Sequence, residues 1–199
     1  MNFGDFKLFY WLSCLALGLV ILSPTLAIIV KLPGGERFSE FWILGPEHMA
    51  EGYPFNVSEN GVYKIHLGIS NHMGDLEHYL VYVKFRNQNE SLPNNVNGTP
   101  SVLQPLFEYR VFLEDGGVWE RQVLFSFGGV SREGNLSRVL RLSLDGSAVN
   151  VDKVAAWDQT NKGFYYQLFF ELWRYNATAS AFQFHDRFVG IWLNMTVAV

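Results

Sequence analysis

Five histidines give this 199-residue chain its most versatile reactive groups, because imidazole binds metal ions and exchanges protons near neutral pH. A metal site would need about three such groups to converge with a carboxylate. The spacing contains neither His-x-His nor His-Glu-x-x-His. We therefore expect no metal ligand and no cofactor, and instead histidines that face solvent or cap turns: His48, His66, His72, His78 and His185.

Two carboxylate pairs could serve acid–base chemistry of the glycosidase type, Glu47 with Glu51 and Glu114 with Asp115. Glu114 and Asp115 open a predicted hairpin turn, which is sufficient reason for their presence. No serine lies in a Gly-x-Ser-x-Gly elbow, and no glycine pair belongs to a phosphate-binding loop. We expect no catalytic residue, and we expect that the chain is not an enzyme.

The composition favours a folded domain with a substantial core. Hydrophobic residues make up 49% of the chain and aromatic residues 16%. The formal net charge is -4 and no block of basic residues occurs, so we expect no nucleic-acid partner. The single cysteine, Cys14, lies in the apolar N-terminal run, which leaves the rest of the chain without disulfides.

An uncharged apolar run extends from Leu8 to Val30, between Lys7 and Lys31. As a helix at ~1.5 Å per residue it would measure about 34 Å, enough to cross a hydrocarbon core of about 30 Å. We predict a transmembrane anchor with its linker at residues 1–33 and an extracytoplasmic domain at residues 34–199. The alternative is a signal peptide cleaved near Ala27, where small residues follow Pro24.

The acceptor pattern Asn-x-Ser/Thr places most of the chain outside the cytoplasm. Random pairing of the 14 asparagines with the 18 serines and threonines would give roughly one such sequon. Five of the six fall in predicted loops or turns, where a glycan can be accommodated. The predicted glycosylation sites are Asn56, Asn89, Asn97, Asn135, Asn176 and Asn194.

Beyond Glu40 the hydrophobic pattern has a period of two residues, which predicts about eight strands separated by Gly-rich turns. This number of short strands predicts an all-β fold, an immunoglobulin-like β-sandwich preceded by the one transmembrane helix. A polar, Asn- and Pro-rich stretch at residues 87–105 is predicted to form a long surface loop. The segment Val151–Gln159 could hold one helical turn.

The segment FYYQLFFELW, Phe164–Trp173, is apolar on both faces and predicts a central strand covered on both sides. The cover could be Val151–Gln159, the long loop or a partner subunit. Large aromatic side chains favour a protein interface or a platform for sugars. The possible interface residues are Trp42, Tyr53, Tyr165, Phe169, Trp173 and Trp192. We also expect Tyr53 to be at least half buried.

The segment GGERFSEFWILGPEHMAEGYPFNVS, Gly34–Ser58, resembles the signature of an archaeal membrane-protein family of unknown function, number sixteen-sixteen of the domain-of-unknown-function series. A second block, Gly68–His72, is similar to the family's Gly-Ile-Val-Asn-His, although Met73 stands where members usually have glutamate. Trp119–Arg121 also resembles a family segment. The resemblance implies a membrane-tethered extracytoplasmic domain in an archaeon, and it implies no activity.

These observations predict a membrane-anchored, N-glycosylated β-sandwich with a structural or protein-interaction role, as an accessory subunit of an archaeal envelope or membrane complex. Its expected partners are the membrane, N-linked glycans, and other envelope proteins or further copies of itself. The alternative is a surface-filament subunit that assembles by strand addition after cleavage near Ala27. A glycan-binding or glycan-active protein is the third possibility.

Overall fold

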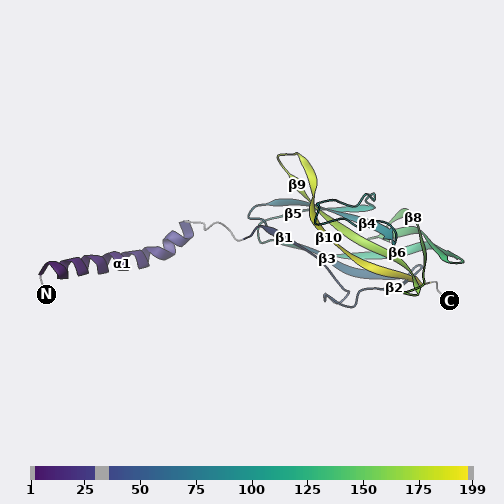
Figure 1. Cartoon of the computed structure of the whole chain (residues 1–199), viewed down its shortest axis with the longest axis horizontal. Coiled ribbons are helices and arrows are strands. Elements are labelled where there is room, and N and C mark those ends of the chain that lie inside the picture. Colours follow the sequence, from purple (N-terminus) through teal and green to yellow (C-terminus); the bar gives the residue numbers. More distant parts are fainter. Residues whose placement is uncertain (1–2, 30–35, 197–199) are drawn as a thin grey trace. The chain divides into compact units, whose positions relative to one another are not determined.

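The structure is a computed structural model that describes residues 3–29 and 36–196. The chain divides into two compact units, Met1–Arg37 and Phe38–Val199. The first contains the helix α1, Phe3–Ile29 (Figure 1). The predicted boundary between residues 33 and 34 lies outside the described residues, as do Val30 and Lys31. Within residues 3–29 and 36–196, no helix has the length and hydropathy of a membrane span.

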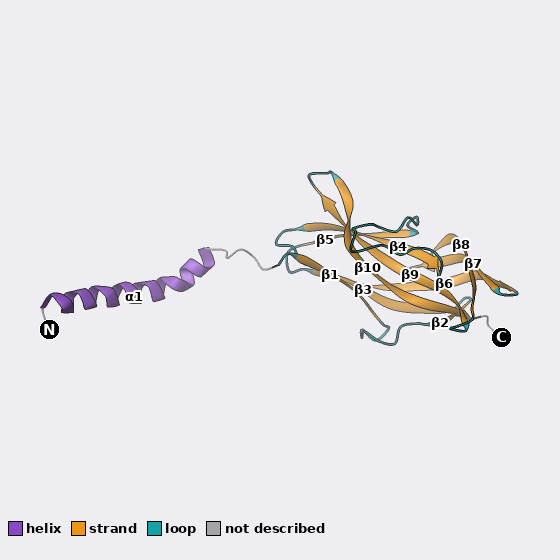
Figure 2. Ribbon diagram, viewed as in Figure 1, coloured by secondary structure: helices purple, strands orange, loops and turns teal. Residues whose placement is uncertain are grey.

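The second unit is built from strands, as the period-two pattern predicts (Figure 2). The prediction of an all-β domain behind one N-terminal helix is therefore confirmed. Residues 36–196 contain β1 (Phe38–Leu44), β2 (Asn56–Ser58), β3 (Val62–His72), β4 (Glu77–Asn87), β5 (Phe107–Leu113), β6 (Val118–Glu133), β7 (Leu136–Leu144), β8 (Ser147–Asp158), β9 (Gly163–Asn176) and β10 (Ala181–Thr196).

These strands form one curled sheet in the order β1-β3-β6-β7-β8-β9-β10-β2, with β4 beside β9 and β5 beside β4. Strands β8 and β9 pair only at Trp157 with Phe164 and at Asp158 with Gly163. The sheet bends at this short junction, so that β1, β3, β6 and β7 form one half and β5, β4, β9 and β10 form the other. The immunoglobulin-like arrangement of these strands stays a prediction.

Strand β8 corrects the sequence interpretation of Val151–Gln159, which does not form a helical turn. This segment belongs to a strand as far as Asp158. A register shift in the pairing with β7 marks a β-bulge here, and Asp152 has a φ of 43°. The bulge and the polar residues Asp152 and Lys153 obscured the strand pattern in the sequence.

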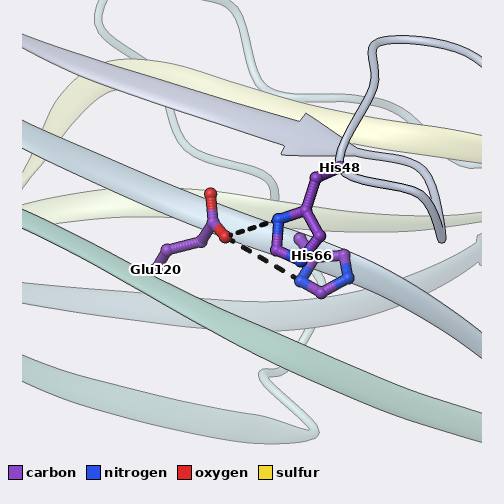
Figure 3. A group of neighbouring side chains, drawn as sticks. All are labelled: His48, His66 and Glu120. Atoms are coloured by element: carbon purple, nitrogen blue, oxygen red, sulfur yellow. Dashed lines mark ion pairs between the residues drawn. The ribbon is translucent and has the colours of Figure 1, made fainter.

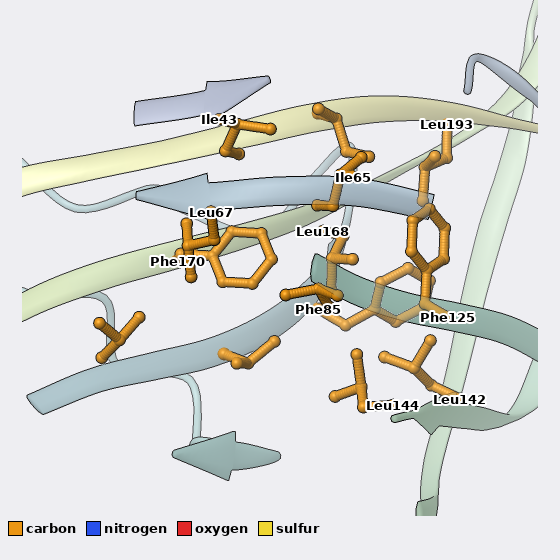
Figure 4. Packing of buried hydrophobic residues seen from close by; sticks show 14 of the residues in the cluster. Ile43, Ile65, Leu67, Phe85, Phe125, Leu142, Leu144, Leu168, Phe170 and Leu193 are labelled. Carbon is orange, nitrogen blue, oxygen red and sulfur yellow. The ribbon is translucent and has the colours of Figure 1, made fainter. Parts of the chain in front are cut away.

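The two halves of the curled sheet enclose one hydrophobic core (Figure 4). Ile65 and Leu67 of β3 lie in the same cluster as Leu168 and Phe170 of β9. All four are fully buried. Burying each such side chain stabilises the fold by roughly 1.5–3 kcal/mol, so alternate residues of facing strands hold the halves together.

The second face of β9 is covered by the long loop that follows β4, one of the three covers that the sequence allowed. Lys84 Nζ of β4 lies 2.8 Å from Glu171 Oε2 of β9 and donates to the loop carbonyl of Ser101 at 2.8 Å. The Ser101 N–H donates to Glu171 Oε1 at 2.8 Å. Both charged side chains are buried, so the loop closes over an ion pair whose polar atoms it helps to satisfy.

We predict that Lys84→Met destabilises the domain by about 3–5 kcal/mol, because it leaves the Glu171 carboxylate buried without its cation. Urea unfolding of the full chain followed by fluorescence measures the change. The double variant K84M/E171L should recover much of the loss, because it removes both charges. Asp152→Asn, which breaks the exposed Arg138–Asp152 pair, is the control and should leave the midpoint unchanged. Equal midpoints for wild type and Lys84→Met would contradict the account.

Candidate functional site

Two histidines and a glutamate meet on the outer face of the β1–β3–β6 half (Figure 3). Glu120 Oε1 lies 3.0 Å from His48 Nδ1 and 3.9 Å from His66 Nδ1. The imidazole rings of His48 and His66 are 3.6 Å apart, centroid to centroid. His66 is buried, whereas the His48 side chain is 59% exposed and the Glu120 side chain 32%. This set, called here the His–Glu cluster, opens to solvent on one side.

Two adjoining hollows lie beside the exposed end of β10, and both are lined by Phe55 and Trp192. The larger, of about 550 Å³, is also lined by Ile43, Tyr53 and the Val189–Ile191 segment. The smaller, of about 310 Å³, is completed by Gln88, Asp158, Asn161 and Tyr165. Phe55 is 47% exposed and Trp192 42%. Large aromatic side chains, half accessible beside a recess, have the chemistry of a binding surface.

The family described as "Domain of unknown function (DUF1616)" matches residues 32–140, more than half of the chain. The chain belongs to the DUF1616 family. The matched region contains all three residues of the His–Glu cluster, and it ends within β7. The resemblance seen in the sequence is thereby confirmed at the level of the family.

Among curated proteins, none matches this DUF1616 member. Among solved structures, a β-glucosidase from Listeria innocua in complex with isofagomine is 7% identical, with a TM-score of 0.36, over 81% of this chain and 16% of that one. The same enzyme in complex with gluconolactone is 16% identical, with a TM-score of 0.29, over 60% of this chain and 16% of that one. The chain thus spans about one sixth of these enzymes, and at such scores the likeness bears on neither fold nor function.

A tight turn after β1 brings His48 to the His–Glu cluster. The Gly45 N–H donates to Met49 O at 2.7 Å, and the His48 N–H donates to Gly45 O at 3.1 Å. A Cβ on Gly45 would lie 2.0 Å from Glu51 O, so only glycine fits. His48 has a φ of 56°, which is uncommon for a residue with a side chain. The turn therefore holds His48 in a sterically costly conformation above β3.

Strand register brings His66 and Glu120 together. His66 pairs with Gln122 and Gly68 pairs with Glu120, so His66 and Glu120 are diagonal neighbours on one face. A Cβ on Gly68 would lie 2.1 Å from the Trp42 ring. The indole of Trp42 therefore lies over Gly68, beside the cluster. The expectation that His66 faces solvent is wrong, because the His48 turn covers the outer face of its strand.

The aromatic residues expected at an interface occupy four environments. Tyr53, Tyr165 and Trp192 line the hollows. Tyr53 is mostly buried, as predicted, and its hydroxyl donates to Ile43 O at 2.9 Å. Trp42 lies beside the His–Glu cluster, and Trp173 donates from its ring N–H to Glu171 at 3.1 Å. Phe169 is fully buried and offers no surface to a partner.

The six sequons differ in the accessibility of the amide nitrogen that a glycan would occupy. Asn89, Asn97 and Asn135 are exposed. Asn194 is partly buried, and its Nδ2 donates to Asn56 Oδ1 at 2.9 Å, whereas Asn56 itself is exposed. The Nδ2 of Asn176 donates to Gln183 Oε1 at 2.9 Å. Asn194 and Asn176 are therefore the poorest acceptors in this conformation.

A chain of polar side chains connects β10 and β4 in one half with β1 and β3 in the other. His185 Nε2 lies 3.0 Å from Ser39 Oγ, which lies 2.6 Å from the Tyr79 hydroxyl. Tyr79 in turn donates to Asn71 Oδ1 at 3.1 Å. A serine beside a histidine is the arrangement of a nucleophile with its base. Ser39 is only 1% exposed, however, so no substrate reaches its Oγ in this conformation.

The pKa of His185 is lowered to about 4, mainly by burial and in addition by the nearby cations Arg174 and Arg187. Between pH 6.5 and 4 the unfolded chain therefore binds a proton at His185 that the folded chain does not. We predict that the associated stability, on the order of 2 kcal/mol, is fully present above pH 6.5 and is lost as the pH falls toward 4.

The variant His185→Gln should be less acid-sensitive than the wild type across this window, because glutamine does not titrate. Urea midpoints of both proteins at pH 7 and pH 4.5 measure the difference, and the common effect of the carboxylates cancels in the comparison. Parallel losses in the two proteins would show that His185 does not carry the dependence.

Proposed function

We propose that this DUF1616 member is a membrane-anchored, N-glycosylated extracytoplasmic domain that binds other envelope or membrane proteins. The anchor would be the uncharged run Leu8–Val30. The large apolar side chains of α1 between residues 6 and 22 are more than half exposed, among them Phe9, Trp11 and Leu15. A helix that is apolar all round needs an apolar environment, and a bilayer supplies it without further protein.

Support for the extracytoplasmic side comes from the sequons. Asn89, Asn97 and Asn135 lie on exposed loops or turns, where an attached glycan would displace no packed side chain. The described strands contain no cysteine, so the fold does not require an oxidising compartment for disulfides. The family resemblance adds an archaeal source to the proposal, and we propose the curled sheet as an immunoglobulin-like sandwich.

We predict glycan occupancy at Asn89, Asn97 and Asn135 and none at Asn194, whose amide nitrogen is already hydrogen-bonded to Asn56 Oδ1. Peptide mass spectrometry of the protein from its native host, with and without enzymatic deglycosylation, measures occupancy at each sequon. A chain without glycan at any of the three exposed positions would contradict the extracytoplasmic assignment.

One observation carries the interaction role: the two hollows meet at the half-exposed Trp192. The guanidinium of Arg86 lies 4.9 Å from the centre of the Trp192 ring, and Arg86 Nε donates to Gln167 Oε1 at 2.8 Å. A tryptophan ring that is already fixed by its neighbours loses little conformational entropy on binding, and tryptophans buried in an interface contribute strongly to the binding free energy. The surface around Trp192 is therefore suited to receive an apolar side chain of a protein partner.

We predict that Trp192→Ala lowers recovery of the native partner at least about tenfold, as expected when truncation removes an anchor worth ~2 kcal/mol. Purification from native membranes in mild detergent, followed by quantitative mass spectrometry, measures partner stoichiometry. Phe112→Ala is the matched control, because Phe112 is 66% exposed and lines neither hollow. Equal loss in both variants, or a wild-type protein recovered alone, would count against the proposal.

The geometry of two strand edges favours a second candidate, the surface-filament subunit. Among the described strands, β1 pairs only with β3, and β10 pairs with β2 only over Asn194–Thr196. The larger hollow lies along these edges, lined by Ile43 and Val189–Ile191. An added strand from another subunit would find backbone groups to pair with there. The N-terminal peptide separates the candidates: Met1 or Asn2 supports the anchor, and a start after Ala27 supports the filament.

A further inference from the structure

We propose that His48, His66 and Glu120 bind one divalent transition-metal ion of the zinc type. In a tetrahedral zinc site with bonds of about 2.0–2.1 Å, neighbouring ligand atoms lie roughly 3.3 Å apart. Glu120 Oε1 is 3.0 Å from His48 Nδ1 and 3.9 Å from His66 Nδ1, so these two separations already bracket that value (Figure 3). All three donor atoms lie within 4.8 Å of one another.

The donor set selects the class of ion. Two imidazoles with one carboxylate suit zinc, copper and nickel, whereas magnesium and calcium require a shell of oxygen atoms. The cluster offers two imidazole nitrogens and one carboxylate oxygen. We therefore expect Zn²⁺ to bind and Mg²⁺ and Ca²⁺ not to bind.

The second observation is that the buried imidazole of His66 makes no hydrogen bond through its Nε2 within the described part of the chain. His66 is 5% exposed, and its Nε2 is buried with no hydrogen-bond partner among the described residues. Its Nδ1 lies 3.9 Å from Glu120, beyond hydrogen-bond range. Buried imidazole nitrogens are normally hydrogen-bonded, because leaving them unpaired is unfavourable. A metal ion between Nδ1 and the Glu120 carboxylate would give this buried imidazole a polar contact that the 3.9 Å separation does not provide.

The surroundings leave room for a fourth ligand. On one side the Trp42 indole lies over Gly68. On the other side His48 and Glu120 are partly exposed to solvent. Three protein ligands with one open position is the pattern of zinc sites that bind water or an external ligand. Zinc would also tie the turn after β1 to β3 and β6, so it should raise the unfolding temperature.

Titration of the full chain tests the proposal. Untagged protein in detergent, freed of metals with EDTA, is titrated with Zn²⁺ by calorimetry and with Co²⁺ by absorption spectroscopy. We expect one ion per chain and visible Co²⁺ bands of a tetrahedral site. The unfolding temperature should rise with Zn²⁺ and stay constant with Mg²⁺ or Ca²⁺.

Two variants remove a proposed ligand, and a third serves as the control. His48→Asn removes a ligand at an exposed position while keeping a residue type that tolerates positive φ. Glu120→Gln removes the anionic ligand. Each should weaken Zn²⁺ binding at least about tenfold and abolish the rise in unfolding temperature. His72→Ala is the matched control, because His72 lies 4.0 Å from the Glu40 carboxylate without a second histidine.

Each outcome decides the question. Stoichiometric binding that His48→Asn and Glu120→Gln lose and His72→Ala keeps supports the site. Absence of saturable Zn²⁺ binding overturns it and leaves the cluster as a hydrogen-bonded contact between the turn and the sheet. Wild-type affinity in His48→Asn, or an equal loss in His72→Ala, also overturns it, because binding would then involve other groups. None of these results depends on the proposed interaction role.

Discussion

The double burial of β9 is the constraint on which the rest of the domain depends. Its inward side chains, including Leu168 and Phe170, join the core, and its outward Phe169 and Glu171 are buried as well. Strand β9 pairs with β4, β8 and β10, so it links the two halves of the sheet. A strand in this position must be covered on both faces. The other half of the curled sheet covers the inward face of β9, and the long loop covers the outward face.

The long loop meets this requirement through charge as well as contact. A polar loop has little apolar surface with which to cover a strand, and its backbone groups need partners wherever they are buried. Lys84 and Glu171 provide them: the cation binds a loop carbonyl, and the carboxylate accepts a loop N–H. The main role of the ion pair is thus to hold the loop against β9. Its net contribution to the free energy of folding is expected to be small, because desolvation of the two charges offsets their attraction.

Sequence patterns were sufficient for most of the strands and insufficient for the contacts between them. Alternation beyond Glu40 predicted most of the strands, and the segment Phe164–Trp173, apolar on both faces, predicted β9. The bulge at Asp152 concealed β8, since one extra residue shifts the period. The burial of His66 could not be predicted, because it depends on a turn from another segment that folds over its face.

The His–Glu cluster could not be predicted from spacing motifs in the sequence. Metal motifs such as His-x-His describe ligands that lie on one helix or strand. These three residues come from a turn and two strands, and the pairing register of β3 with β6 brings His66 and Glu120 together. A signal existed in the glycines: Gly68 has an indole where its side chain would be, and Gly45 has a carbonyl. Glycine at a strand interior marks a close approach of other atoms.

The turn at Gly45 connects the two candidate sites of the domain. It points His48 back over β3, and the same chain continues to Tyr53 and Phe55, which line the larger hollow. Tyr53 is fixed there by its hydrogen bond to Ile43 O, on the edge of β1. A change that loosened the turn would therefore move both the His–Glu cluster and one wall of the hollow. The turn thus meets a geometric requirement, a sharp reversal after the first strand that only glycine permits at position 45, and the two surfaces it positions are where a ligand and a partner are to be sought.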